Sequence, residues 1–218
     1  ADTSGNNNHF ATTNFSTNGN NVKDAPINNF ATINTLATTA TVSEGGLKST
    51  TGSTIRMGGP STQGVRKGKW YMEYKITDIN SINMNVGVGN DQGVLFSDFL
   101  EGVDWWNASN SYAYENNGNK RSTGVNASYG ASYTTGDIIG IALDMDNRKL
   151  YFSKNGTFQD SGDPTSGSTG TGAAFTLTEN LFNKPLTYFF AWGDNDGSSG
   201  CTVEANFGNP SFTISSNS

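Results

Sequence analysis

The chain is poor in several residue types, and each shortage narrows the possible functions. Its single cysteine, Cys201, cannot form a disulfide within the chain, and we expect this small residue to be buried. Its only histidine, His9, lies in a polar segment, which argues against Ser-His-Asp or Cys-His catalysis and against a histidine-rich zinc site. No run approaches the roughly 18 apolar residues of a membrane span, and no segment has the pattern of a secretory signal. We therefore expect a soluble chain without membrane insertion.

Charged residues are also few and mostly scattered. They make up 15% of the 218 residues, with a formal net charge of −6 and a pI near 4.6. The 13 lysines and arginines cluster only at Arg66, Lys67 and Lys69. A nucleic-acid-binding surface needs clustered cations to displace counterions from phosphates. The sequence therefore predicts no nucleic-acid partner.

The residues that are abundant favour short strands joined by turns. Aromatic residues make up 11% of the chain, there are 27 glycines, and no segment shows helical periodicity. The clearest pattern lies between Gly136 and Gly156. Here an apolar run at 138–143 precedes an alternating strand at 149–153, and Asp146-Asn147-Arg148 between them is typical of a hairpin turn. A second turn is predicted at Asn155-Gly156. The sequence thus predicts an all-β fold.

The hairpin resembles the core of the SPRY domain family, in which a Gly-Asp, an apolar strand, an acidic turn and a Leu-Tyr-Phe-x-x-Asn-Gly strand follow one another. Other segments match the family in order: Gly68 to Tyr74 (GKWYMEY), Val86 to Gly89 (VGVG), Tyr112 to Tyr114 (YAY), Pro185 to Phe190 (PLTYFF) and Val203 to Gly208 (VEANFG). The resemblance covers about residues 64 to 214. It implies an antiparallel β-sandwich of the concanavalin A-like jelly-roll type, which we assign to residues 64–218. Within it we expect Trp70 and Tyr74 in the core and leave Trp192 unassigned.

Residues 1–63 differ from the rest and are rich in Asn, Thr, Ser and Gly. We interpret them as an extended arm that needs another surface to pack against, because they contain few large apolar residues. The spaced residues Phe10, Phe15, Phe30, Ile33 and Leu36 would anchor this arm, either to the sandwich or to a neighbouring chain. The stretches at 38–42, around Leu47 and at 55–57 could add one or two edge strands.

The arm carries a second resemblance. Residues 2–10, 14–16 and 24–34 are similar to a segment that precedes SPRY domains in structural and tail-fibre-like proteins of bacteriophages. This resemblance implies a protein on the virion surface, outside cells, whose arm contacts other virion subunits or further copies of itself. A homo-oligomer is therefore expected.

Enzymatic and metal-binding patterns are weak. Glycoside hydrolysis needs two carboxylates across a cleft, whereas Asp144 and Asp146 lie on or beside a turn that the SPRY resemblance explains. We predict no catalysis and no cofactor. Asp194 and Asp196 begin a short acidic loop that could hold calcium, but Ala205 stands where such loops place a glutamate, so a plain turn is the preferred interpretation.

Binding is the remaining activity, and the loops at one end of the sandwich are its expected location. The segment 91–119 is rich in aromatic, acidic and amide side chains, which suit sugar recognition by ring stacking and hydrogen bonding. Candidate ligand-binding residues are Asp104, Trp105, Trp106, Tyr112, Asn116 and Asn117. The same tryptophans could instead serve packing or subunit contacts, since side chains alternate along a strand.

Two functional hypotheses follow. The first is a non-enzymatic structural and recognition protein of a virion, such as a head decoration, fibre or tail component. The second is a lectin-like adhesin or secreted module that binds a cell-surface glycan or protein.

Overall fold

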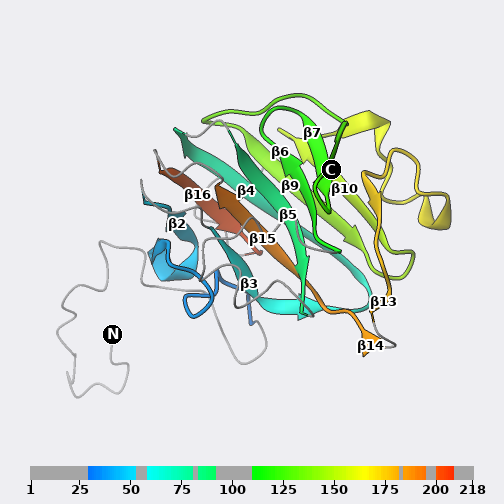
Figure 1. Cartoon of the computed structure of the whole chain (residues 1–218), viewed down its shortest axis with the longest axis horizontal. Coiled ribbons are helices and arrows are strands. Elements are labelled where there is room, and N and C mark those ends of the chain that lie inside the picture. The colour runs from blue at the N-terminus through cyan, green and yellow to red at the C-terminus, as the bar shows by residue number, and fades with distance from the viewer. Residues whose placement is uncertain are drawn as a thin grey trace, which may run out of the picture.

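Two packed antiparallel sheets form the protein, as the computed structural model shows for residues 29–52, 58–80, 83–91, 110–181, 184–194 and 200–208 (Figure 1). The described residues of the larger sheet form β1 (Thr41–Ser43), β2 (Lys48–Thr50), β16 (Cys201–Asn206), β4 (Lys69–Ile79), β9 (Ile138–Asp144), β10 (Lys149–Lys154) and β11 (Thr157–Phe158), in this order, with β12 (Phe175–Thr176) also on β10. Those of the smaller sheet form β3 (Gly58–Val65), β15 (Tyr188–Asp194), β5 (Met84–Asn90), β6 (Tyr112–Glu115), β7 (Asn119–Ser122) and β8 (Val125–Ser128). The fold is all-β, as predicted.

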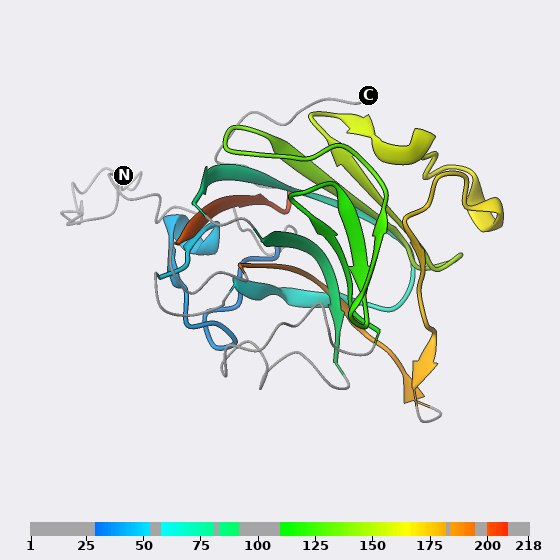
Figure 2. The same ribbon diagram turned by 45° about the horizontal axis from the view of Figure 1, so that its top comes forward.

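Short elements complete the described part of the chain. Strands β13 (Asn180–Leu181) and β14 (Lys184–Pro185) pair with each other, and single 3-10 turns occur at η1 (Glu44–Gly46), η3 (Gln159–Ser161) and η4 (Gly167–Thr169). No helix among these described residues has the length and apolar character needed to cross a membrane. The two sheets appear as separate layers when the molecule is turned (Figure 2).

The predicted hairpin forms the middle of the larger sheet. Strand β9 pairs with β4 on one side and with β10 on the other. The side chains of its apolar run are buried at all positions except the first. The turn to β10 places Arg148 at a φ of +57°, and the predicted second turn has positive φ at both Asn155 and Gly156. Both turns are therefore confirmed.

The space between the sheets is filled largely by aromatic rings. Tyr114 of β6 stacks on Phe152 of β10, with ring centroids 5.3 Å apart, and thereby connects the two sheets. Tyr74 of β4 and Trp192 of β15 are fully buried, and so is Cys201. The predictions for Tyr74 and Cys201 are confirmed, and Trp192 is now assigned to the core.

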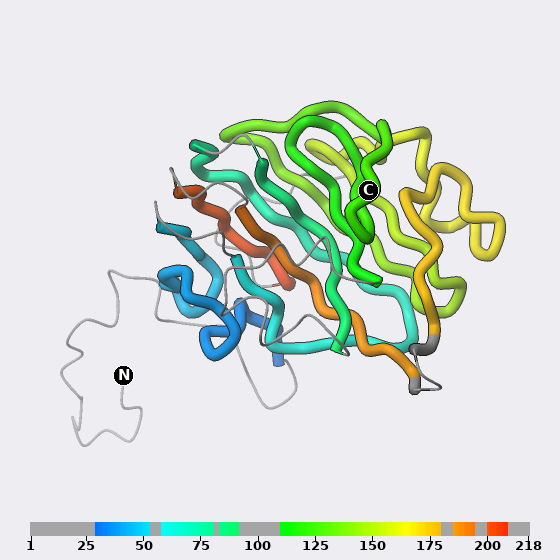
Figure 3. Tube along the Cα trace, viewed as in Figure 1, coloured from blue at the N-terminus to red at the C-terminus, as the bar shows by residue number. Residues whose placement is uncertain are grey.

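The segment before residue 64 contributes to the sandwich itself. Strands β1 and β2 lie at the edge of the larger sheet, and β2 pairs with β16 although the two are far apart in sequence (Figure 3). Ile33 forms an antiparallel bridge with Ser61. Strand β3 spans the predicted boundary at residue 63, so the sandwich includes residues on both sides of it. The stretch 53–57, which holds part of the predicted edge strands, lies outside the described residues.

One predicted position is wrong: Trp70 was expected in the core but is 47% exposed. Leu36 is 84% exposed, so it does not pack against the sandwich, and its anchoring to a neighbouring chain stays a prediction. Trp70 follows the alternation of β4, yet it lies near the start of that strand, where the core ends. Its indole Nε1 donates a hydrogen bond to the carbonyl of Lys67 (2.7 Å), which holds the ring at the rim.

Candidate binding surface

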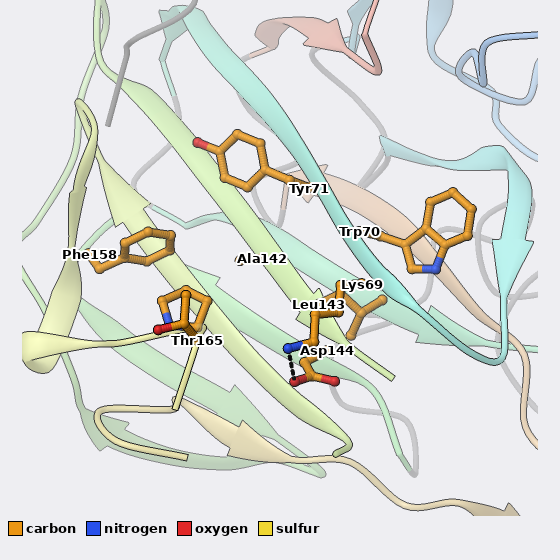
Figure 4. A pocket seen from close by; sticks show the side chains of 9 residues that line it. Lys69, Trp70, Tyr71, Ala142, Leu143, Asp144, Phe158 and Thr165 are labelled. Carbon is orange, nitrogen blue, oxygen red and sulfur yellow. Dashed lines mark ion pairs between the residues drawn. The ribbon is translucent and has the colours of Figure 1, made fainter. Parts of the chain in front are cut away.

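A pocket of about 340 Å³ opens on the outward face of the larger sheet. Its lining comes from β4, β9 and the segment after β10: Lys69, Trp70, Tyr71, Ala142, Leu143, Asp144, Phe158, Pro164 and Thr165 (Figure 4). We call it the first pocket. Tyr71 of β4 pairs with Ala142 of β9, so the tyrosine ring lies beside a small side chain of the pocket lining. Phe158, which also lines the pocket, contributes a second ring, and the result is an apolar hollow.

Alternation along β4 explains why Tyr71 faces outward. Met72 and Tyr74 point into the core, so Tyr71 and Glu73 lie on the opposite face. The Tyr71 hydroxyl donates to Glu73 Oε1 (2.8 Å). Burial of the hydroxyl raises the pKa of Tyr71, a hydrogen bond with Ser153 opposes this rise, and Glu73 adds to it. Tyr71 is therefore neutral at physiological pH and presents a half-exposed ring with a fixed hydroxyl.

An ion pair borders the first pocket. Lys69 Nζ lies 3.4 Å from Asp144 Oδ2. Asp144 also accepts hydrogen bonds from the backbone N–H groups of Asp146 and Asn147 and from the Asn147 side chain. Burial opposes ionisation of Asp144, but the hydrogen bonds from Asn147 and the charge of Lys69 outweigh it and hold the pKa of Asp144 below its usual value. The carboxylate therefore holds the β9–β10 turn in place.

A second pocket, of about 240 Å³, shares Trp70 and Tyr71 with the first. The two rings point to opposite sides of β4 (Figure 4), which explains how neighbouring residues serve two hollows. The remaining lining is largely apolar: Asn29, Phe30, Ala31, Gln63, Val65, Met72, Phe190 and Phe207. We call the two pockets and the exposed rings between them the Trp70–Tyr71 surface.

A third, larger hollow of about 590 Å³ is charged. It is lined by Arg66, Lys67, Met145, Asp146, Arg148, Glu179, Pro185 and Leu186. Most of these charges are used locally: Arg148 pairs with Glu179 at 3.2 Å, and Asp146 Oδ1 accepts a hydrogen bond from the Gly68 N–H. Arg66 pairs with Asp91 at 3.4 Å. These exposed pairs stabilise the loops only weakly, because solvent screens them.

Comparison with known proteins identifies the fold. The family model described as "SPRY domain" matches residues 69–210, which is more than half of the chain. The chain belongs to the SPRY domain family. The SPRY domain of human HERC1 superposes with a TM-score of 0.53 at 21% identity, and the match covers 78% of this chain and 92% of that one. This structural likeness agrees with the predicted sandwich.

A curated relative is much longer than this chain. The dual specificity protein kinase splA of Dictyostelium discoideum is 32% identical over 105 residues, which cover 45% of this chain but 4% of the kinase. The shared part is thus a small piece of that protein. SPRY domains are non-catalytic modules that mediate protein–protein interactions. Both matched proteins are eukaryotic, so the bacteriophage setting stays a prediction from sequence resemblance.

The SPRY structure separates the predicted ligand-binding residues. Tyr112 begins β6 and is buried against Phe175 and Tyr188. Asn116 and Asn117 follow the other end of β6, where Asn116 Oδ1 accepts a hydrogen bond from the Met84 N–H. Tyr112 therefore does not meet the two asparagines. Asp104, Trp105 and Trp106 lie outside the described residues, and their role in binding stays a prediction.

The predicted arm residues also divide. Phe10 and Phe15 lie outside the described residues, whereas Phe30 is partly buried and lines the second pocket. The sequence left open whether the anchors pack against the sandwich or against a neighbouring chain. Ile33 packs against the sandwich, because it is buried in the core of its own SPRY domain.

The predicted acidic loop is only partly described. Asp194 is buried and accepts a hydrogen bond from Thr51 Oγ1 (3.2 Å), while Asp196 lies outside the described residues. Within the described part of the chain, no three His, Cys, Asp or Glu side chains gather to hold a metal ion. Calcium binding at this loop stays untested.

The Trp70–Tyr71 surface was missed at the sequence level. Its signal was nevertheless present, because two adjacent aromatic residues on one strand cannot both point into the same core. The other half of the first pocket had no such signal, since Phe158 and Pro164 reach Tyr71 only through the folding of the segment after β10.

Proposed function

We propose that this SPRY domain is a non-enzymatic recognition module that binds a short segment of a partner protein at the Trp70–Tyr71 surface. The observation that carries the proposal is the pair of half-exposed rings, 47% for Trp70 and 46% for Tyr71, standing between two apolar pockets. An apolar side chain of the partner would enter the first pocket, and its backbone would lie along β4.

Three features support this assignment. Tryptophan and tyrosine are enriched among the residues that dominate binding energy at protein interfaces. Both rings are held in place before binding, Trp70 by Lys67 and Tyr71 by Glu73, which lowers the entropy cost of association. The carboxylate beside the pocket, Asp144, is committed to the turn and to Lys69, which leaves an apolar hollow suited to recognition.

Binding is expected to depend on Trp70. Ligands would be selected from a library of displayed peptides and from a glycan array, and their dissociation constants measured with the original chain and with Trp70→Ala. Truncating a central aromatic contact removes about 2 kcal/mol or more, so we expect a roughly 30-fold or greater loss of affinity. Selected peptides should share a large apolar residue.

Val125→Ala provides the matched control, because Val125 is 69% exposed on β8 of the other sheet. It should leave the affinity unchanged. A ligand whose affinity is insensitive to Trp70→Ala would contradict the proposed site. Selection of glycans but no peptides would favour the lectin-like alternative over protein recognition.

We further propose, from the bacteriophage resemblance of residues 2–10 and 24–34, that the chain is displayed on a virion surface and that its arm mediates assembly with further subunits or copies. Residue 29 joins the sandwich at the second pocket, on one side of the fold. An arm that starts there could reach a neighbouring subunit.

The mass in solution tests this arm. Light scattering should give a multiple of 23.1 kDa for the full chain and a monomer for the variant with Phe10→Ser and Phe15→Ser. Point substitutions are preferable to removing residues 1–60, because that deletion would also remove Ile33, β1, β2 and part of β3. A monomer in both cases would rule out self-assembly through these side chains.

A further inference from the structure

The group of cations noted in the sequence, Arg66, Lys67 and Lys69, lies where the chain turns from β3 into β4. Two of the three have carboxylate partners: Arg66 Nη2 is 3.4 Å from Asp91 Oδ2, and Lys69 Nζ is 3.4 Å from Asp144 Oδ2. Lys67 is exposed and forms no ion pair with any residue that the structure describes. Its amine is therefore available to a ligand.

Lys67 lines the hollow of about 590 Å³, which we call the charged hollow. This volume lies within the range of ligand-binding clefts, roughly 300–1,000 Å³. Other charged groups of the lining are engaged: Arg148 pairs with Glu179 (3.2 Å), and Asp146 Oδ1 accepts a hydrogen bond from the Gly68 N–H (2.9 Å). Among the described residues of the lining, the charge that is left for a ligand is therefore the single positive charge of Lys67.

The turn that carries Lys67 is held on two sides. The Gly68 carbonyl accepts a hydrogen bond from the Met145 N–H (2.9 Å), which together with the bond to Asp146 ties this turn to the one between β9 and β10. The Lys67 carbonyl accepts a hydrogen bond from the indole of Trp70 (2.7 Å). The backbone of Lys67 is therefore in place before a ligand binds, and only its side chain has to be ordered.

The bond between Lys67 and Trp70 also joins the charged hollow to the Trp70–Tyr71 surface. Lys67 lines the hollow, and Trp70 lines both apolar pockets. The indole lies against the turn, since a Cβ at Gly68 would be 3.4 Å from the Trp70 Nε1. A partner segment that covers Trp70 can therefore place a neighbouring side chain in the charged hollow.

We propose that the partner segment at the Trp70–Tyr71 surface is acidic, and that a carboxylate beside its apolar residue binds Lys67 in the charged hollow. This site rests on the function proposed above, because the same segment must occupy the first pocket. A carboxylate fits better than a phosphate, since one amine offers one positive charge. Arginines bind phosphate through paired hydrogen bonds, but Arg66 and Arg148 are already engaged by carboxylates. Lys67 would then select acidic segments among the apolar ones that the first pocket accepts.

A double-mutant cycle between Lys67 and the ligand tests this pair. The probes are acetyl-Leu-Glu-Leu-amide and its neutral counterpart acetyl-Leu-Gln-Leu-amide, in which a leucine on each side allows either chain direction. NMR titrations of the full chain and of Lys67→Gln would give the dissociation constants, with the N–H groups of Gly68 and Leu186 as reporters of the charged hollow. We expect the original chain to bind the glutamate peptide about three- to fivefold more tightly than the glutamine peptide, because an exposed ion pair contributes little. Lys67→Gln should bind both peptides equally.

Three controls make the result decisive. Lys48→Gln removes the same charge from β2, near the other edge of the larger sheet, and should keep the preference for glutamate. An equal loss with Lys48→Gln would show that only the overall charge matters and would overturn the proposal. About 1 M salt, which shortens the screening length to about 3 Å, should remove the preference in the original chain. A phosphoserine peptide that binds clearly more tightly than the glutamate peptide would assign the hollow to phosphate and overturn the choice of a carboxylate.

Trp70→Ala separates this site from the function on which it rests. If Trp70→Ala weakens both peptides and the original chain does not distinguish glutamate from glutamine, the proposed function stands and the carboxylate site is overturned. If Trp70→Ala has no effect and the preference for glutamate still depends on Lys67, the carboxylate site stands and the Trp70–Tyr71 surface fails. Absence of binding by both peptides overturns the carboxylate site, whereas the displayed peptides judge the proposed function separately.

Discussion

Replacing Trp192 with alanine is expected to lower the free energy of unfolding by about 3–5 kcal/mol, the cost typical of deleting a buried aromatic ring. Trp192 is fully buried in β15, which lies between β3 and β5 in the smaller sheet. It pairs with Gly59 on one side and Val86 on the other. The cavity left by the indole could not be filled without moving both neighbouring strands. Urea denaturation followed by circular dichroism would measure the change.

Trp192→Phe is the matched control. The indole Nε1 has no hydrogen-bond partner within the described part of the chain, so phenylalanine removes a buried polar group while keeping much of the ring. We expect a clearly smaller loss than for alanine. A loss below about 1 kcal/mol for Trp192→Ala would show that this side chain does not support the core.

Gly87→Ala is expected to cost about 1–3 kcal/mol or more, because there is no room for a methyl group. A Cβ at Gly87 would stand 2.0 Å from the Tyr112 carbonyl oxygen and 2.9 Å from the Ala113 Cα. Both atoms belong to the backbone of β6, which pairs with β5. The two strands would have to separate, since no flexible side chain can give way.

Gly52→Ala is the control for the same substitution in open space. A Cβ at Gly52 meets none of the described atoms within 4 Å. Alanine there reduces the freedom of the unfolded chain, so we expect a neutral effect or a gain of about 0.4–1 kcal/mol. Equal effects at the two positions, in parallel urea titrations, would contradict the crowding between β5 and β6.

The sequence was informative where the interactions are local. The strands β9 and β10 and their turn followed from a hydrophobic run, an alternating strand and turn-forming residues within about twenty positions, and the register agrees with that pattern. The family resemblance then supplied the sandwich. Within that resemblance, Tyr74 was correctly expected in the core.

The sequence was uninformative where segments meet from far apart. The burial of Ile33 depends on its bridge to Ser61, and the exposure of Trp70 depends on where the sheets end. Neither is encoded in the residue or its neighbours. Likewise, Tyr112, Asn116 and Asn117 are close in sequence, but β6 separates the tyrosine from the asparagines along its length.

The described ends of the fold also meet each other. A Cβ at Gly208 would lie 2.9 Å from Cε1 of Phe30, so the backbone at residue 208 passes directly beside that ring. A domain whose two ends lie close together can be inserted into a surface loop of another protein without separating the two ends of that loop. The same closeness favours circular permutation, in which residues 29 and 208 are joined and new ends are opened elsewhere. We therefore expect the SPRY domain to fold when it is inserted as a unit into another protein.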